Sequence, residues 1–207
     1  MRFFGARRMR AVTMAAGMLL ALSLGRAARA DPATGQIEAL DTALVDTMKA
    51  AKDLGVQGRY HRLEPAVARA FDFAAMTRIA VGPSWASIPT AQQQALIGAF
   101  ERLTAASYAH NFNGYSGERI EVDPNVLTRG PDKVVTTHLI SPGQAPVTIA
   151  YRMREAGGGW KIIDVFYNGA ISQLTTRRSD FAATLAQGGA PALIAHLNAL
   201  ADKQLKP

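Results

Sequence analysis

The sequence predicts an α+β domain in which helices stand before and after a curved, four-stranded antiparallel sheet and pack around an apolar pocket. Apolar residues recur at helical spacing up to about residue 111, and the period changes to two between residues 118 and 167. The helical period then returns and continues toward the C-terminus. Helices, then consecutive strands, then helices are typical of α+β folds rather than of alternating α/β folds.

Residues 1–30 have the parts of a secretory signal peptide. Arginines at positions 2, 7, 8 and 10 precede an apolar run over residues 11–24, and Ala28-Arg29-Ala30 precedes Asp31. The apolar run is short for a membrane-spanning helix, although an uncleaved membrane anchor is the alternative. We therefore expect export to a bacterial periplasm, cleavage after Ala30, and one mature domain over residues 31–207.

Composition excludes several classes of function. Residues 1–30 hold six arginines and no acid, so the formal net charge of +7 falls to +1 without them, with 17 basic against 16 acidic residues. A near-neutral domain lacks the basic footprint of a nucleic-acid-binding protein. The absence of cysteine excludes disulfides and thiolate chemistry. The four histidines, at positions 61, 110, 138 and 196, lack metal-ligand spacing, so we expect no metal and no cofactor.

Four helices are expected before the sheet, each with an apolar stripe at helical spacing, over residues 34–54, 58–70, 73–81 and 90–111. Gly55 ends the first, and Pro65 predicts a kink or restart in the second. Asp72 is placed to cap the third. Thr90 and Gln93 have the spacing of a capping box that opens the fourth.

Four strands are expected from alternating apolar residues, over residues 118–123, 133–140, 147–155 and 160–167. Glycines 157–159 predict a hairpin between the last two, which makes the sheet antiparallel. A helix then runs to Gly188 and Gly189, and Pro191 suits the first turn of a final helix.

No motif predicts catalysis. Ser84, in Gly82-Pro83-Ser84-Trp85-Ala86, lacks the strand before and the helix after it that a nucleophile elbow requires. The sequence also contains no phosphate-binding loop, no dinucleotide fingerprint and no zinc-protease motif. We therefore do not expect an enzyme.

Asp164 lies in the middle of the apolar strand over residues 160–167, where an unpaired carboxylate is costly. We expect a structural ion pair with Arg178, in the helix that follows. The alternative is a steroid-isomerase-like enzyme, in which Asp164 moves a proton and a nearby tyrosine holds the oxyanion.

The helices offer more apolar surface than one face of a four-stranded sheet can receive. This surplus predicts either a thick core with helices on both faces or an apolar ligand cavity. Side chains alternate between the two faces of a strand, so the apolar positions on the inward face are candidates for lipid binding, together with those on the apolar face of the helix over residues 90–111. These are Trp85, Phe100, Leu103, Tyr108, Val147, Ile149, Tyr151, Trp160, Val165 and Tyr167.

Several stretches resemble, in order, the MlaC-type family, also called toluene-tolerance auxiliary proteins. They include Phe71-Asp-Phe-Ala-Ala-Met-Thr-Arg-Ile-Ala-Val-Gly82, Thr90-Ala-Gln-Gln-Gln-Ala-Leu-Ile-Gly-Ala-Phe100, Tyr115-Ser-Gly-Glu118 and Gly159-Trp-Lys-Ile-Ile-Asp164. The tail, from Ile171-Ser-Gln-Leu-Thr-Thr-Arg-Arg-Ser-Asp-Phe181 to Gly188-Gly-Ala-Pro-Ala-Leu-Ile194, is most similar to the hopanoid-associated, HpnM-like subgroup.

The resemblance implies an NTF2/cystatin-like sheet with added helices and a periplasmic phospholipid carrier. Such carriers move lipid between the outer and inner membranes, with an outer-membrane lipoprotein complex and an inner-membrane ABC transporter bearing an MCE-type subunit as partners. In the hopanoid-associated subgroup the cargo could be a hopanoid instead. An adaptor that docks on a membrane complex and holds no lipid is a further alternative, and a solid core would favour it.

Overall fold

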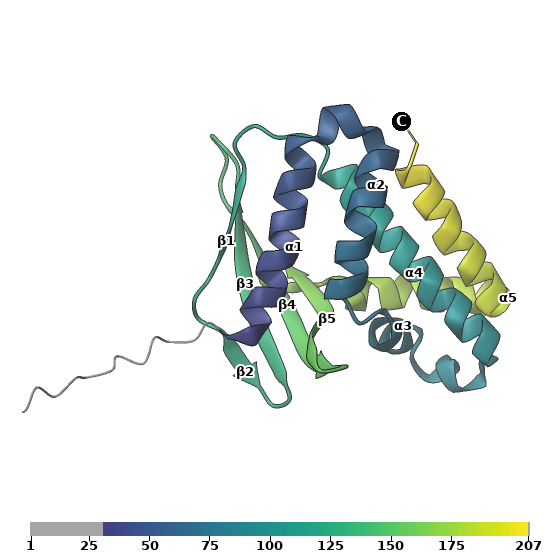
Figure 1. Cartoon of the computed structure of the whole chain (residues 1–207). Helices are drawn as coiled ribbons and strands as arrows, with labels where there is room; N and C mark the ends of the chain where they lie inside the picture. Colours follow the sequence, from purple (N-terminus) through teal and green to yellow (C-terminus); the bar gives the residue numbers. More distant parts are fainter. Residues whose placement is uncertain (1–30, 207) are drawn as a thin grey trace, which may run out of the picture.

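The computed structural model describes residues 31–206, and the predicted signal peptide over residues 1–30 lies outside them. The helices are α1 (Pro32–Lys49), α2 (Ala51–Ala70), α3 (Phe73–Val81), the short 3₁₀ helix η1 (Gly82–Ser87), α4 (Thr90–Asn111) and α5 (Gln173–Gln204). The strands are β1 (Arg119–Val122), β2 (Leu127–Arg129), β3 (Asp132–Ile140), β4 (Val147–Ala156), β5 (Gly159–Tyr167) and β6 (Ile171–Ser172) (Figure 1).

The predicted capping residues behave differently at the starts of two helices. Asp72 caps α3 as predicted, because its carboxylate accepts a hydrogen bond from the Ala75 amide at 2.9 Å. The capping box at the start of α4 is wrong, since α4 has no side-chain cap. The side-chain amide of Gln93 instead donates to the Trp85 carbonyl at 2.9 Å, which the turn of η1 brings within reach.

Glycines break two helices where the sequence predicts it, but the predicted helix over residues 34–54 is wrong, because α1 ends at Lys49 and α2 begins at Ala51. Gly55 in α2 has φ of 60° and ψ of −179°, a conformation that favours glycine. In α5, Gly189 has φ of 64°, and it follows the non-helical Gly188. The chain resumes a helix after each break, so α2 and α5 are kinked rather than ended. Among the residues of α2, only Gly55 has non-helical dihedrals, so Pro65 does not start a new helix.

The antiparallel sheet is confirmed, but it has six strands in the described part of the chain rather than the predicted four. Its order is β1-β3-β4-β5-β6, with β2 also paired to β3. The two missed strands have three and two residues, too few to display an alternating pattern. A register shift between Arg152 and Met153 interrupts the pairing of β4 with β5, and such a bulge bends a strand and increases its twist.

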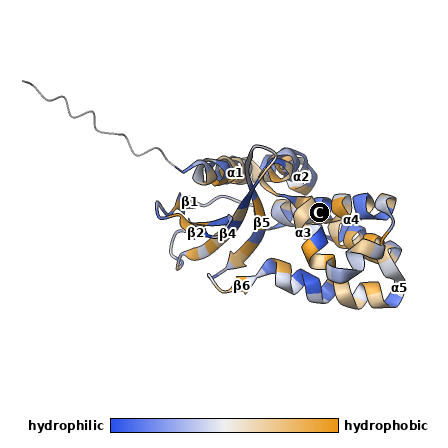
Figure 2. Ribbon diagram, turned by 90° about the horizontal axis from the view of Figure 1, so that it is seen from below, coloured by the Kyte–Doolittle hydropathy of each residue, from blue (hydrophilic) through white to orange (hydrophobic). Residues whose placement is uncertain are grey.

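The helices form a layer on one face of the sheet and a bundle beside it. Helices α1 and α2 lie along that face, and α4 packs against both α2 and α5 (Figures 1 and 2). The side chains of Ile149, Tyr151 and Met153 on β4 are buried on this side. Among residues 31–206, no helix is both long and apolar enough to cross a membrane.

Candidate functional site

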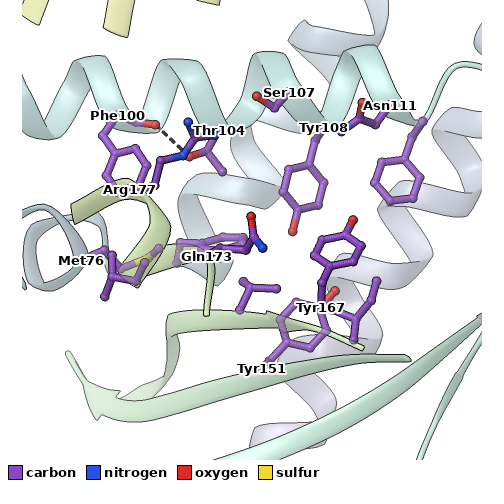
Figure 3. A pocket seen from close by; sticks show the side chains of 15 residues that line it. Met76, Phe100, Thr104, Ser107, Tyr108, Asn111, Tyr151, Tyr167, Gln173 and Arg177 are labelled. Atoms are coloured by element: carbon purple, nitrogen blue, oxygen red, sulfur yellow. Dashed lines mark hydrogen bonds between the residues drawn. The ribbon is translucent and has the colours of Figure 1, made fainter. Parts of the chain in front are cut away.

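A cavity of about 170 Å³ lies between α4, the inner face of β4 and β5, and the first turns of α5 (Figure 3). Most of its wall is apolar or aromatic. Its lining residues are Phe71, Met76, Phe100, Thr104, Ser107, Tyr108, Asn111, Phe112, Ile149, Tyr151, Val165, Tyr167, Gln173, Leu174 and Arg177.

One stripe of α4 supplies a third of this wall. Phe100, Thr104, Ser107, Tyr108 and Asn111 all line the cavity, at offsets of zero, four, seven, eight and eleven residues. These offsets place them on a single helical face. The stripe is apolar at Phe100 and becomes polar toward the C-terminal end of the helix.

Two cross-strand pairs supply the opposite wall. Ile149 on β4 pairs with Tyr167 on β5, and Tyr151 pairs with Val165. The two positions are two residues apart on each strand, so all four side chains share the inner face of the sheet. Tyr151 is buried and Tyr167 is half-exposed at the end of β5.

Aromatic rings continue the wall deep into the helical core. The rings of Phe100 and Phe181 pack edge to face at a centroid distance of 5.4 Å, and those of Phe73 and Phe100 pack in the same way at 6.0 Å. Phe71 contacts both Phe73 and Tyr108. Such aromatic contacts favour offset or T-shaped geometry and make a rigid apolar surface.

Three tyrosines meet inside the cavity. Figure 3 shows Tyr108 reaching from α4 toward Tyr151 and Tyr167 on the sheet. Burial raises the pKa of the Tyr108 and Tyr151 hydroxyls, and the proximity of the tyrosines to one another raises it further. Both hydroxyls are therefore protonated hydrogen-bond donors at neutral pH.

A buried carboxyl on α1 lies near these tyrosines. Asp41 is 6% exposed, and neither of its carboxyl oxygens has a hydrogen-bond partner among residues 31–206. Burial, with a smaller contribution from the charge of Glu38, raises the pKa of Asp41 to about 7. A carboxyl without a partner favours the neutral form, because burial disfavours the charge.

Polar side chains gather on the more exposed part of the cavity wall. Thr104 and Ser107 are half-buried on α4, and Asn111 at its end is exposed. Gln173 and Arg177, both half-buried on α5, lie across from them. The cavity therefore combines an apolar interior with a rim of neutral hydrogen-bonding groups and one cation.

Six of the ten predicted lipid-binding residues lie on this cavity, namely Phe100, Tyr108, Ile149, Tyr151, Val165 and Tyr167. Four lie elsewhere. Leu103 is buried in the core, and Trp85 and Val147 pack against the core from its edge. Trp160 lies beneath Lys133, whose Nζ is 4.4 Å from the ring centroid and 2.6 Å from an Asp31 carboxylate oxygen. The alternation of side chains along a strand indicates which face of the sheet a residue occupies, but it does not indicate which positions along the strand reach the cavity.

The predicted ion pair between Asp164 and Arg178 is wrong, because no ion pair within residues 31–206 involves Asp164. One carboxylate oxygen accepts from the Val165 and Leu174 amides at 2.8 and 3.1 Å. The other accepts from the Ser172 hydroxyl at 2.7 Å. The start of α5 thus supplies neutral donors close by, and they solvate the buried charge in place of a guanidinium.

Nine of the lining residues were not predicted from the sequence, although the spacing of some of them along α4 indicates that they face the cavity. Thr104 and Asn111 continue the helical stripe that Phe100 and Tyr108 begin, although they are polar. No such pattern marks Phe71, or Gln173 and Arg177 on α5, because the fold alone brings these elements together.

The geometry does not support the enzyme that the sequence left open. Asp164 is absent from the cavity wall and does not meet a tyrosine hydroxyl there. Within the described chain, no group of three His, Cys, Asp or Glu side chains is arranged to hold a metal ion.

Comparison with solved structures identifies the fold. The phospholipid-binding protein from Ralstonia solanacearum, solved in complex with a phospholipid, matches with a TM-score of 0.73. The two sequences are 23% identical, and the match covers 85% of this chain and 100% of that one. No curated protein matches the chain.

Comparison with family models identifies the family. The model of the MlaC protein family matches residues 38–199, which include every residue that lines the cavity. Proteins of this family are periplasmic lipid-binding carriers and not enzymes. Because the match spans most of the sequence, the chain belongs to the MlaC protein family.

Proposed function

We propose that this protein binds a phospholipid, with hydrocarbon in the cavity beneath α4 and the head group at its rim, and carries it through the periplasm. The observation that carries the proposal is the cavity itself, an aromatic interior that ends in a polar rim with one arginine. The phospholipid bound by the Ralstonia solanacearum protein of the same fold supports this choice of ligand.

The apolar interior fits the cost of moving lipid through water. Exposing a two-chain lipid of about 30 methylenes costs on the order of 24 kcal/mol, at roughly 0.8 kcal/mol each. A carrier lowers this cost by offering an apolar wall such as that of Phe71, Phe100 and Ile149. The binding step breaks no covalent bond, so it needs no catalytic group.

The cavity must widen to hold a lipid. Its volume of about 170 Å³ is below the roughly 300–1,000 Å³ of pockets that enclose small-molecule ligands. The first turns of α5 are the wall best placed to move away from α4, because they face the cavity with the half-buried polar side chains of Gln173 and Arg177. The hydrogen bond from Leu174 to Asp164 keeps these turns attached to β5. We infer that lipid entry separates these turns from α4.

Arg177 is the group we assign to the lipid phosphate. Among residues 31–206, its guanidinium is the one cationic side chain on the wall of this cavity. Arginine recognises phosphate through paired, charge-assisted hydrogen bonds. Gln173 and Asn111 can donate further hydrogen bonds to phosphate or glycerol oxygens from the same rim.

Membership of the MlaC family supports a proposal for the exchange partners. We propose delivery to an inner-membrane ABC transporter with an MCE-type subunit and exchange with an outer-membrane lipoprotein complex. Export by the signal peptide over residues 1–30, with cleavage after Ala30, belongs to the same proposal.

A hopanoid is the second candidate cargo. The tail over residues 171–194, similar to that of the hopanoid-associated subgroup, favours it. The flat, rigid rings of Phe71, Phe100 and Tyr108 also suit a fused polycyclic hydrocarbon. Without a phosphate on the ligand, Arg177 would contribute little to its binding.

Native mass spectrometry of the protein expressed in a periplasm, with lipid extraction and identification, tests the proposal. A one-to-one phospholipid adduct supports it, and a hopanoid adduct moves the assignment to the second cargo. A mass without ligand that persists after incubation with both lipid classes contradicts both, and favours a lipid-free adaptor.

A further inference from the structure

A second hollow, also of about 170 Å³, lies on the outer face of the sheet. Arg152 and Arg154 border it from β4, and they alternate with Tyr151 and Met153, which are buried on the inner face. α3 and α5 complete its wall, and Leu174 lines both this hollow and the lipid cavity.

Two arginines of the hollow are held in place by one carboxylate. The Nε atoms of Arg152 and Arg154 each donate to an oxygen of Asp132 at 2.6 Å. Asp132 is fully buried, whereas the two arginine side chains remain 46% and 44% exposed. The Nη2 atoms of both arginines also contact Asp132, so their Nη1 groups are the ones available in a fixed orientation, which lowers the entropy lost when a ligand binds.

A third arginine faces them from α5. Arg178 forms no ion pair within residues 31–206. Its guanidinium lies beside Gly82, where an added Cβ would be 3.4 Å from a guanidinium nitrogen. Arg178 is therefore a third guanidinium on the hollow, and unlike Arg152 and Arg154 it has no carboxylate of the described chain bound to it. Asp164 lies on the same wall and Asp72 acts on Arg154 from the start of α3, so the positive charge that stays open to a partner is that of Arg178.

The floor of the hollow is apolar. Ile163 and Leu174 are buried there, and Ile79 on α3 stands at its edge with 41% of its surface exposed. An engineered cavity of about 150 Å³ in another protein binds benzene, so this volume suits one aromatic or aliphatic side chain. Arginine around an apolar centre is also the composition of protein interfaces.

We propose that this hollow is a docking site for a partner protein that presents one apolar side chain flanked by carboxylates. The exposed guanidinium of Arg178, which forms no ion pair within residues 31–206, selects the acidic flanks, and the apolar floor selects the central side chain. A recess of side-chain size fits a protein surface better than a membrane, which meets protruding apolar groups. Because Leu174 belongs to both walls, the docked partner contacts the turn of α5 that closes the lipid cavity.

Fluorescence anisotropy of the whole mature protein with a fluorescein-labelled Glu-Glu-Phe-Glu-Glu peptide tests the site. We expect binding that weakens with salt, and little binding of a Lys-Lys-Phe-Lys-Lys peptide. Arg178→Glu should weaken binding by about tenfold or more, since it reverses one of three converging charges. Ile79→Ser should weaken it severalfold through the lost apolar contact. Arg62→Glu makes the same charge change at an exposed residue of α2 and should leave binding almost unchanged.

Three results would overturn the proposal. These are no binding of the acidic peptide, equal binding by the Arg178→Glu protein, and equal binding of a peptide with Ala in place of Phe. Co-sedimentation with phosphatidylglycerol vesicles that Arg178→Glu abolishes, while peptide binding stays unchanged, would assign the face to a membrane instead. Arg178→Gln repeats the test without charge reversal, and circular dichroism confirms that each variant is folded.

Discussion

The hydroxyl of Ser172 donates a hydrogen bond of 2.7 Å to the carboxylate of Asp164 and so joins the start of α5 to the middle of β5. The other carboxylate oxygen binds the Leu174 amide at 3.1 Å. Since Leu174 lines the lipid cavity, this contact between β5 and α5 also holds one cavity wall in position.

Replacing Asp164 with Ala should destabilise the protein by about 3 kcal/mol, because buried donors lose their acceptor and each unmet group costs roughly 1–3 kcal/mol. Urea unfolding followed by circular dichroism measures the change. Asp180→Ala, at an exposed position on the same helix, is the control and should change stability by less than about 0.5 kcal/mol. Unchanged unfolding of the Asp164→Ala protein would show that the carboxylate has no structural role.

Asp41 should make stability fall as the pH rises. Its pKa is raised from 3.8 to about 7 by burial, so the folded state holds a proton that the unfolded state releases. The contribution is fully present below pH 3.8 and is lost as the pH rises through 7. Between pH 5 and pH 8, we expect a loss on the order of 3 kcal/mol from this group.

Urea unfolding across this pH range, compared between the wild type and Asp41→Asn, measures the effect. The Asn variant cannot ionise, so its stability should depend less on pH and exceed that of the wild type at pH 8. Asp46→Asn removes an exposed carboxylate from the same helix and should keep the wild-type dependence. Identical pH profiles for the Asp41→Asn and wild-type proteins would mean that Asp41 titrates normally.

Ser107→Trp should block lipid binding. Ser107 lies on the cavity wall, and an indole there occupies much of the volume of about 170 Å³. The side chain is half-buried near the rim, so the fold should survive. Gln94→Trp, at an exposed position earlier on α4, is the matched control. Lipid retention by native mass spectrometry should fall only for Ser107→Trp, and full retention would place the ligand elsewhere.

Gly189→Ala should destabilise the kink in α5. Gly189 has φ of 64° and ψ of −162°, a conformation that costs a residue with a Cβ roughly 1–3 kcal/mol. Gly35→Ala in α1 is the contrasting variant, because nothing lies within 4 Å of its added Cβ and alanine favours a helix. Thermal unfolding should therefore give a lower Tm for the first and an equal or higher Tm for the second.

The sequence by itself determined the α+β class, the longer helices and strands and the helix-breaking glycines. Periodicity reports these features directly, since an element of ten residues repeats its buried face several times. The breaks at Gly55 and Gly189 can also be predicted from sequence, because the positive φ that glycine allows is a property of the residue itself. The same reasoning missed β2 and β6, because strands of three and two residues are too short to show an alternating apolar pattern.

Tertiary structure alone decided which apolar residues line a cavity and which fill the core. Phe100 and Leu103 lie three residues apart on one helix, yet only Phe100 lines the cavity, because the neighbouring elements differ. Tertiary structure likewise gave Asp164 neutral donors from α5 rather than a guanidinium. A local pattern specifies which face is buried, but the contact partner of a side chain depends on residues distant in the sequence.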